Sequence, residues 1–307
     1  MLPLRFSDLR SVQLVCAHLQ TTPRALQSFL REPERYYTPI DLPQAPGRRP
    51  RRVFEVGAPL RRIHRVLAVA LAPHVDAQPS YIQGFRSGRS IRSNAAMHVD
   101  AEVVVTADIR GFFDEIDVER VTSLFQSLGA TFQAATLLAR LTTFQGHLPQ
   151  GGRASPAISN LAVPDLDKAL VRLGGRCAYT RYADDLTFSG SAAACPTEEQ
   201  IRRVLESSGF QLRPRSFRRQ LKGSGQIVTG LSVVSGSPTL TRRTRREIER
   251  ALYFGARFGL SYHASRAGSE RSPQREFARL CGHIAAAGGV DKTLHAKWVK
   301  LLESVNL

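Results

Sequence analysis

The sequence RYADDLTFSG at residues 181–190 places two adjacent aspartates between two short runs of β-forming residues. The flanking segments CAYTRY and LTFS favour strands, so Ala183, Asp184 and Asp185 are expected at a hairpin turn. Adjacent carboxylates repel each other, and burying an unpaired carboxylate is costly. A fold that keeps both aspartates here must supply positive charge beside them. An Asp-Asp pair is also ordinary turn chemistry, and the motif alone leaves both interpretations open.

A third aspartate, Asp108, ends an apolar, β-branched run, EVVVTADI at residues 102–109, which predicts a buried strand. If this strand neighbours the hairpin, carboxylates from two elements meet at one edge of a sheet. Such hard oxygen ligands suit Mg²⁺. Two ions about 4 Å apart can activate an attacking hydroxyl and stabilise a leaving pyrophosphate. The pattern therefore predicts a nucleotidyl-transfer site.

The remaining chain alternates helical and extended patterns. We expect a hairpin at residues 36–58 whose loop carries Arg48, Arg49, Arg51 and Arg52, and a strand pair at residues 226–236. From Thr239 onward the pattern is helical and basic. Residues 8–31 are expected to be helical, with Thr22-Pro23 starting a second turn of helix. Further helices are expected at residues 59–73, 118 onward, 131–141 and 198–208, and the loops at 84–98 and 146–163 are each expected to lead into a helix.

The chain is strongly basic, with 43 Lys and Arg against 26 Asp and Glu, a net charge of +17 and a pI near 10.7. Such a surplus favours a polyanionic partner, above all nucleic acid. The four cysteines show no metal-binding spacing, and a reducing cytosol fits them better than a disulfide framework. No apolar run has the length of a signal peptide or a membrane span, so we expect a cytoplasmic protein without membrane contact.

Three motifs occur in the order expected of a polymerase palm: TADIRGFFDEID (106–117), PQGGRASPAISN (149–160) and YADDLTFSG (182–190). Together they resemble the reverse transcriptases. The resemblance implies an α+β fold of the right-hand polymerase type, with fingers, a palm with an antiparallel sheet, and a helical thumb. The implied domains are residues 1–98 (fingers with an N-terminal helical region), 99–225 (palm, with fingers segments interleaved at about 119–160) and 226–307 (primer-grip strands and basic thumb).

Two further motifs narrow the resemblance to retron reverse transcriptases, which copy a partner RNA into RNA-linked DNA. N-A-x-x-H occurs at Asn94, Ala95 and His98, and V-T-G occurs at residues 228–230. The resemblance implies that Asn94, His98, Thr229 and Gly230 take part in RNA recognition. Equally, Asn94 could cap a short helix, His98 could be a structural core histidine, and Thr229-Gly230 could form an ordinary turn.

The resemblance also implies roles at the active site. Asp108, Asp184 and Asp185 would bind two Mg²⁺ ions, with the carbonyl of Ile109 as a further ligand. Phe113 would exclude a 2′-hydroxyl and so favour deoxynucleotides, unless it is simply a core residue. Gln150 would contact the incoming nucleotide or its template pair, and Arg52 would neutralise the triphosphate, although the sequence does not decide which arginine of its cluster does so.

A basic segment, TRRTRREIER at 241–250, repeats arginines at helical spacing. As part of a thumb it would hold an RNA duplex by its backbone; otherwise it is a solvated face. The residues implied in RNA binding here are Arg242, Arg243, Arg245, Arg246 and Arg250.

The segment GFQLRPRSFRR (209–219) departs from the family. Arg213 stands where relatives usually carry Asn, and Ser216 falls near the position of a Lys thought to protonate pyrophosphate. An arginine does not readily give up its proton. That role stays open between electrostatic action by Arg215 or Arg218, water, and Lys222. Val234 also stands where relatives often have Asn.

These features predict an RNA-directed DNA polymerase of a retron, primed from a guanosine 2′-hydroxyl. Its partners would be a structured non-coding RNA, the RNA–DNA hybrid product, dNTPs and a separate effector protein in anti-phage defence. A second reading is another bacterial reverse transcriptase, either a stand-alone defence enzyme or a group II intron type; the short chain after the thumb disfavours the latter. A third is a catalytically silent RNA-binding scaffold, which the presence of all three aspartates argues against.

Overall fold

The computed structural model describes residues 4–42, 50–260 and 272–305. The chain forms two compact units. The first contains residues 1–89, 105–188 and 194–218, and the second contains residues 90–104, 189–193 and 219–307. Their boundary passes through three strands, which are β3 (Val103–Arg110), β5 (Asp185–Gly190) and β7 (Arg218–Leu221).

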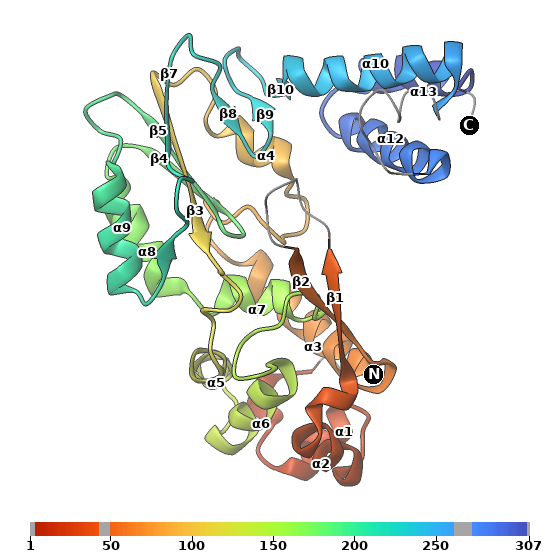
Figure 1. The fold of residues 1–307 in the computed structure, drawn as a ribbon. Helices are drawn as coiled ribbons and strands as arrows, with labels where there is room; N and C mark the ends of the chain where they lie inside the picture. The colour runs from red at the N-terminus through yellow and green to blue at the C-terminus, as the bar shows by residue number, and fades with distance from the viewer. Residues whose placement is uncertain (1–3, 43–49, 261–271, 306–307) are drawn as a thin grey trace. The chain divides into compact units, whose positions relative to one another are not determined.

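The N-terminal segment of the first unit is helical, as its sequence predicts (Figure 1). Ser11 and Thr22 accept backbone hydrogen bonds from the first turns of the helices that follow them, which fixes where those helices begin. Pro23 has a backbone angle suited to the first helical position. The elements are η1 (Phe6–Asp8), α1 (Val12–His18), α2 (Pro23–Arg31) and η2 (Pro33–Tyr36).

An antiparallel ribbon follows, formed by β1 (Tyr37–Leu42) and β2 (Arg51–Val56). The predicted hairpin is confirmed, but Arg51 and Arg52 belong to strand β2 and not to the connecting loop. Arg48 and Arg49 lie outside the described residues. Helix α3 (Ala58–Asp76) comes next and has Pro59 in its first turn.

The largest sheet has the strand order β4-β5-β3-β6, and β7 also pairs with β3. Strand β3 begins with three valines that are fully buried, which confirms the buried strand. Strands β4 (Ala178–Tyr182) and β5 are neighbours joined by only Ala183 and Asp184, so the hairpin turn is confirmed. On this sheet, α8 (Pro164–Gly174) packs against β4, and α9 (Glu198–Ser207) packs against α8 and β6 (Gln211–Leu212) (Figure 1).

Three helices complete the first unit. Helices α5 (Val118–Ser127) and α6 (Phe132–Thr142) pack along each other, because apolar residues recur on their facing sides. Helix α7 (Ser155–Leu161) packs on α3 and α5, and it follows the Gly/Pro loop as expected.

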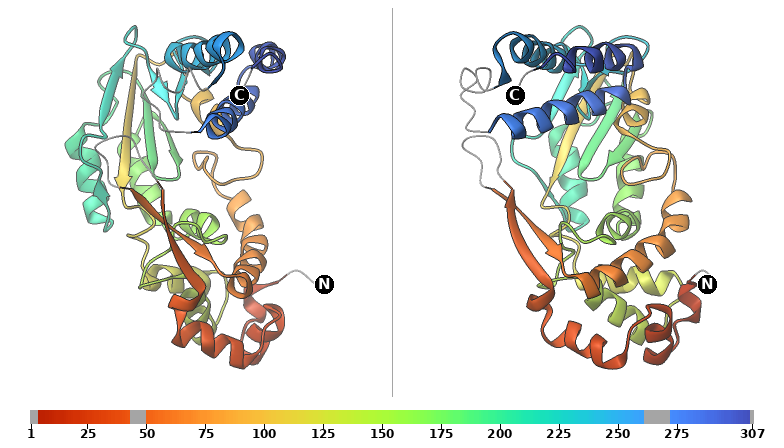
Figure 2. Two further views of the ribbon diagram at one scale, coloured as in Figure 1. Left: turned by 45° about the vertical axis from the view of Figure 1, so that its right-hand side comes forward. Right: turned by 90° about the vertical axis from the view of Figure 1, so that its right-hand side faces the viewer.

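Among its described residues, the second unit contains a short helix, a small sheet and three longer helices. Helix α4 (Ile91–Ala96) packs on β8 (Ile227–Val228) and β9 (Leu231–Ser232), which form the predicted strand pair, and β10 (Thr239–Leu240) adds to β9. Helices α10 (Arg242–Phe258), α12 (Pro273–Gly288) and α13 (Lys292–Leu302) pack together (Figure 2). The buried Trp298 belongs to the hydrophobic core that they share. Helices combined with antiparallel strands confirm the α+β class.

Across the described residues, none of the helices combines the length and the apolar character that crossing a membrane requires.

Candidate active site

Asp108 and Asp184 lie together because β3 and β5 are neighbours in the sheet. The Ile109 N–H donates to the Asp184 carbonyl at 3.0 Å, which joins the end of β3 directly to the hairpin turn. The structure thus brings the two aspartate-bearing elements together at one edge, as the sequence predicts.

The turn itself has a strained backbone that its surroundings must hold. Ala183 has a φ of 57°, a conformation that non-glycine residues rarely adopt. Arg181, at the end of β4, is completely buried and donates to the Ala183 carbonyl at 3.3 Å. It also makes two 2.7 Å hydrogen bonds to Asp167 of α8 and one of 3.2 Å to the side chain of Asn160 of α7. A buried ion pair therefore anchors the turn to two helices.

The other side of the turn is closed by Gly84. A Cβ atom on this residue would lie 2.6 Å from the backbone nitrogen of Ala183, closer than real Cβ atoms come to such atoms. The Gly84 carbonyl accepts a hydrogen bond from Asn160 at 2.7 Å, and the Gln83 N–H donates to the Arg181 carbonyl at 2.9 Å. Sequence reasoning missed this support, because neither Arg181 nor Asp167 belongs to a motif with evident chemistry.

Arg213 faces both strands of the site. Its guanidinium lies 2.7 Å from Asp108 Oδ2 and 3.6 Å from Asp184 Oδ2. The residue that departs from the family pattern thus supplies the positive charge that the clustered aspartates require. Ser216 accepts from the Asp108 N–H at 3.2 Å and donates to the Arg213 carbonyl at 2.7 Å, so its hydroxyl holds the segment in place.

The carboxylates influence one another. Burial, and after it the charge of Asp184, raises the pKa of Asp108 to about 7, although Arg213 acts in the opposite direction. Burial and the charge of Asp184 also raise the pKa of Asp185 to about 6. The raised pKa values mean that these carboxyl groups tend to bind protons, which lowers the repulsion between them. A bound cation would lower the repulsion in their place.

The chemistry of the three aspartates fits a divalent cation. Asp108 Oδ1 is buried and has no hydrogen-bond partner among the described residues, so a hard oxygen ligand is ready to bind. Within residues 4–42, 50–260 and 272–305, however, no three His, Cys, Asp or Glu side chains are already arranged to hold a metal. The Arg213 guanidinium lies between the carboxylates of Asp108 and Asp184.

The two arginines of β2 differ in their partners. Successive side chains of a strand point to opposite faces. Arg52 lies opposite Asp41 of β1 and forms a bidentate ion pair with it, at 3.0 and 3.2 Å. Arg51 donates instead to the side chain of Gln150 at 2.6 Å, and it helps to lower the pKa of Asp108. The structure associates Arg51, and not the predicted Arg52, with the predicted nucleotide-contacting glutamine.

The loop that carries Gln150 is fastened to β2. The Phe54 N–H donates to the Gln150 carbonyl at 2.7 Å, and Gly151 approaches the Phe54 carbonyl so closely that a Cβ would collide with it. Gly151 also has a φ of 108°, which only glycine adopts without strain. Gly151, which follows Gln150 in the PQGG segment, is therefore required by backbone geometry.

Phe112 and Phe113, which follow the end of β3, have different surroundings. Phe112 is a core residue beneath the Arg181 guanidinium, which lies 5.5 Å from its ring centre. Phe113 is 9% exposed and meets the half-exposed Phe85 edge-on, with ring centres 6.3 Å apart. Of the two rings, Phe113 is the less enclosed, although it packs against its neighbours.

In the second unit, the two retron-type motifs are in contact. Asn94 is fully buried and donates to the Thr229 hydroxyl at 3.4 Å, and that hydroxyl donates to the Ile91 carbonyl at 3.2 Å. His98 is also buried, and its Nδ1 lies 2.8 Å from the Ser189 hydroxyl. Only Gly230 of this group is exposed. The side chain of Asn94 thus supports the turn from inside, whereas His98 contacts β5. Asn94 is an interior residue of α4 and not its cap.

The five predicted arginines of α10 fall into two groups. Arg243 and Arg245 form ion pairs with Glu247 and Glu249 one turn further along. Arg242, Arg246 and Arg250 are exposed, and no ion pair joins them to any residue within the described part of the chain.

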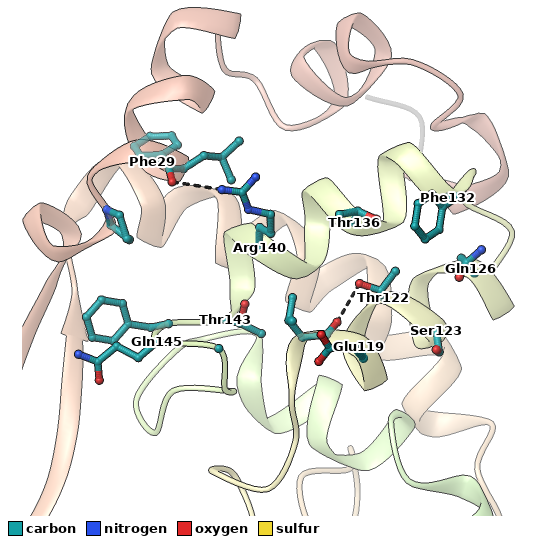
Figure 3. Close-up of a pocket in the computed structure, with 15 residues that line it drawn as sticks. Phe29, Glu119, Thr122, Ser123, Gln126, Phe132, Thr136, Arg140, Thr143 and Gln145 are labelled. Atoms are coloured by element: carbon teal, nitrogen blue, oxygen red, sulfur yellow. Dashed lines mark hydrogen bonds between the residues drawn. The ribbon is translucent and has the colours of Figure 1, made fainter.

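A separate cavity of about 570 Å³ opens between α2, α5 and α6 (Figure 3). Arg140 crosses it and donates to the Leu30 carbonyl at 3.4 Å. None of the predicted site residues lines this cavity.

An antiparallel sheet that presents aspartates from two adjoining strands defines the palm of a right-hand polymerase. The family model described as "Reverse transcriptase (RNA-dependent DNA polymerase)" matches residues 52–214, which is more than half of the chain. The chain therefore belongs to the reverse transcriptase family, and its relatives make it a retron-type member. Members of this family use divalent metal ions.

Three curated relatives illustrate the similarity. The Retron Mx162 reverse transcriptase of Myxococcus xanthus is 37% identical over 55% of this chain and 42% of its own length. The Retron Mx65 reverse transcriptase of the same organism is 34% identical over 74% of this chain and 58% of its own. The Retron Ec86 reverse transcriptase of Escherichia coli is 25% identical over 68% of this chain and 67% of its own. The chain thus spans about half the length of the two Myxococcus relatives.

Proposed function

We propose that this protein is the RNA-directed DNA polymerase of a retron, with Asp108, Asp184 and Asp185 as its catalytic residues. One observation carries the proposal: a single guanidinium touches carboxylates from β3 and from the β4–β5 turn, within a chain matched by the reverse transcriptase family. Two aspartate-bearing strands meeting at an edge suit divalent cations, which in turn would bind the charged phosphates.

The three aspartates, with the carbonyl of Ile109, are the proposed ligands of two Mg²⁺ ions. When bound, such ions activate the attacking hydroxyl and stabilise the leaving pyrophosphate. The protein's own contribution is to hold these oxygens in place, which the anchored turn and the hydrogen bond from Ile109 to Asp184 support. Orientation of this kind supplies a large part of the rate enhancement of many enzymes.

The nucleotide is proposed to lie over the loop at Gln150. Arg51 extends from β2 toward this loop and is the better placed arginine for a triphosphate, while Arg52 would first have to leave Asp41. Phe113 remains the proposed discriminator against a 2′-hydroxyl. Its test is Phe113→Ala: incorporation of ribonucleotides should rise relative to deoxynucleotides, and an unchanged ratio would contradict this role.

The finer features are proposals that rest on the resemblance to retron reverse transcriptases. We propose a structured non-coding RNA as template, priming from a guanosine 2′-hydroxyl, and an RNA-linked multicopy single-stranded DNA as product. A separate effector protein, a role in anti-phage defence and action in the cytoplasm complete the proposal.

The predicted domains are kept as part of the proposal. Residues 1–98 are the proposed fingers and 99–225 the palm, with fingers segments at about 119–160. Residues 226–307 are the proposed primer grip and thumb, with the exposed face of α10 and the turn at Thr229 and Gly230 as RNA contacts. The buried Asn94 would act through that turn, and the buried His98 through Ser189 of β5.

The test is to express the chain with its native flanking DNA, beside a variant carrying Asp184→Asn and Asp185→Asn. Nucleic acid is extracted and separated on a denaturing gel, with and without RNase and debranching enzyme. A discrete DNA that these treatments shorten, and that the variant lacks, is the expected result.

Two other results would point elsewhere. RNA that co-purifies equally with both proteins, without any DNA, would favour the RNA-binding scaffold. Extension of a supplied primer on RNA, without a branched product in cells, would favour another kind of reverse transcriptase.

A further inference from the structure

The backbone of Arg213 is fixed directly opposite Asp108. Strand β6 pairs antiparallel with β3, with Leu212 opposite Ile109, and the Arg213 N–H donates to the Asp108 carbonyl at 2.8 Å. Pro214 follows and favours an extended backbone at Arg213. The side chain therefore begins beside the carboxylates, whatever its rotamer.

The guanidinium of Arg213 occupies oxygens that a metal ion would need. It contacts Oδ2 of Asp108 at 2.7 Å and Oδ2 of Asp184 at 3.6 Å, so one organic cation bridges the two strands. A divalent ion ligated by these two aspartates needs the same negative charge and much of the same space. The arginine and the metal are thus competitors for one position.

The arginine is able to leave. Its side chain is 46% exposed, whereas that of Asp108 is only 19% exposed. The pair is therefore partly screened by water, and ion pairs of this kind are weak. Metal binding to carboxylates that are otherwise mutually repulsive is the stronger interaction, so exchange is possible without disturbing β3 or the turn.

We propose that Arg213 is an exchangeable cation of the active site: it bridges Asp108 and Asp184 before metal binds, and the metal binds by displacing its guanidinium. The proposal rests on the proposed function, because it takes these two aspartates as metal ligands. It also gives a reason for an arginine at a position where a neutral residue would leave the carboxylates unbalanced. Arg213 thereby sets how much metal the enzyme requires.

The experiment measures binding of Mn²⁺ alone to the purified full chain by isothermal titration calorimetry, without nucleotide or template. The variants are Arg213→Asn and Arg213→Lys. The matched control is Arg110→Asn, which removes the same charge from the same strand pair. Arg110 is exposed and donates to Gln211 at 3.1 Å, and no ion pair joins it to a carboxylate within the described residues.

Removing the competitor should strengthen Mn²⁺ binding by Arg213→Asn about three- to tenfold, the size expected for a partly exposed ion pair. Arg213→Lys should fall between that variant and the wild type, and Arg110→Asn should stay within about twofold. A second readout is the melting temperature: Arg213→Asn should melt below the wild type in EDTA, and saturating Mn²⁺ should remove the difference.

Equal or weaker Mn²⁺ binding by Arg213→Asn would overturn the exchange, while leaving the proposed polymerase intact. An Asp184→Asn variant separates the two proposals. If it binds Mn²⁺ as well as the wild type does, Asp184 is no metal ligand, and the proposed function fails together with the exchange.

Discussion

The contact between Gly84 and the turn that carries the proposed catalytic aspartates allows a quantitative prediction. Gly84→Ala would place a Cβ 2.6 Å from the Ala183 nitrogen and 3.2 Å from the Tyr182 carbonyl carbon. Both are backbone atoms, so no side chain can simply rotate away. Reaching an ordinary separation of 3.4 Å requires a shift of about 0.8 Å.

This shift falls on the turn that carries Asp184. The turn has little freedom on its other side, because the buried Arg181 holds the Ala183 carbonyl. A displacement near 1 Å costs an enzyme on the order of 10²-fold in rate, so we expect kcat to fall about 10- to 100-fold. Substrate affinity should change little, since Gln150 belongs to another loop. Overpacking should also lower the free energy of unfolding by about 1–3 kcal/mol.

The assay is single-turnover extension of a DNA primer on an RNA template at saturating Mg²⁺, with far-UV circular dichroism to confirm folding. Gly57→Ala is the matched control, because a Cβ there meets no atom closer than 3.6 Å and the backbone is unstrained. It should keep at least half of the wild-type rate. A folded Gly84→Ala protein with wild-type kcat would refute the claim that this contact sets the position of the turn.

Three further predictions concern charge. Asp167→Asn leaves a buried arginine without its carboxylate and should lower the free energy of unfolding by about 3 kcal/mol in a urea titration; a loss below 1 kcal/mol would contradict an anchoring role. The folded-state pKa values of Asp108 and Asp185 are raised to about 7 and 6, so the folded protein binds more protons than the unfolded one between pH 4 and 7. In EDTA its stability should therefore fall as pH rises through that window, and replacing both residues by Asn should flatten the curve. Arg246→Gln should weaken binding to an RNA–DNA duplex and reduce the slope of log binding constant against log salt concentration by about 1. Arg243→Gln removes an arginine that is already paired with Glu247, so it should change this slope less. Equal slopes for the two variants would contradict the distinction.

Much of the palm was predictable, because its signals are local. A continuous β-branched run indicates a buried strand, and two short strands around Asp184 and Asp185 indicate a hairpin. The order of the motifs then places Asp108 beside them. The strand bounds differ from the prediction by about one residue, since β3 covers Val103–Arg110 where residues 102–109 were expected.

The contacts that the sequence did not reveal depend on the register of strand pairing and on partners that are distant in the sequence. Whether Arg51 or Arg52 faces Gln150 follows from the pairing of β2 with β1, which composition does not specify. The ion pair between Arg181 and Asp167 joins a strand to a helix, and neither residue stands in a chemical motif. Arg213 was visible only as a departure from the family, and its contacts required the pairing of β6 with β3.

The hydrogen bonds that join the site also bear on how the chain matures during synthesis. Residue 109 bonds to residue 184, and residue 213 bonds to residue 108, so the edge is closed by contacts between segments far apart in the sequence. Contacts of this kind form late, because long loops must close before they are made. A nascent chain emerges from its N-terminus and folds in that order. Until the segment around residue 213 has left the ribosome, the aspartates on β3 and on the turn lack their bridging arginine, and the growing polypeptide carries an unassembled candidate site.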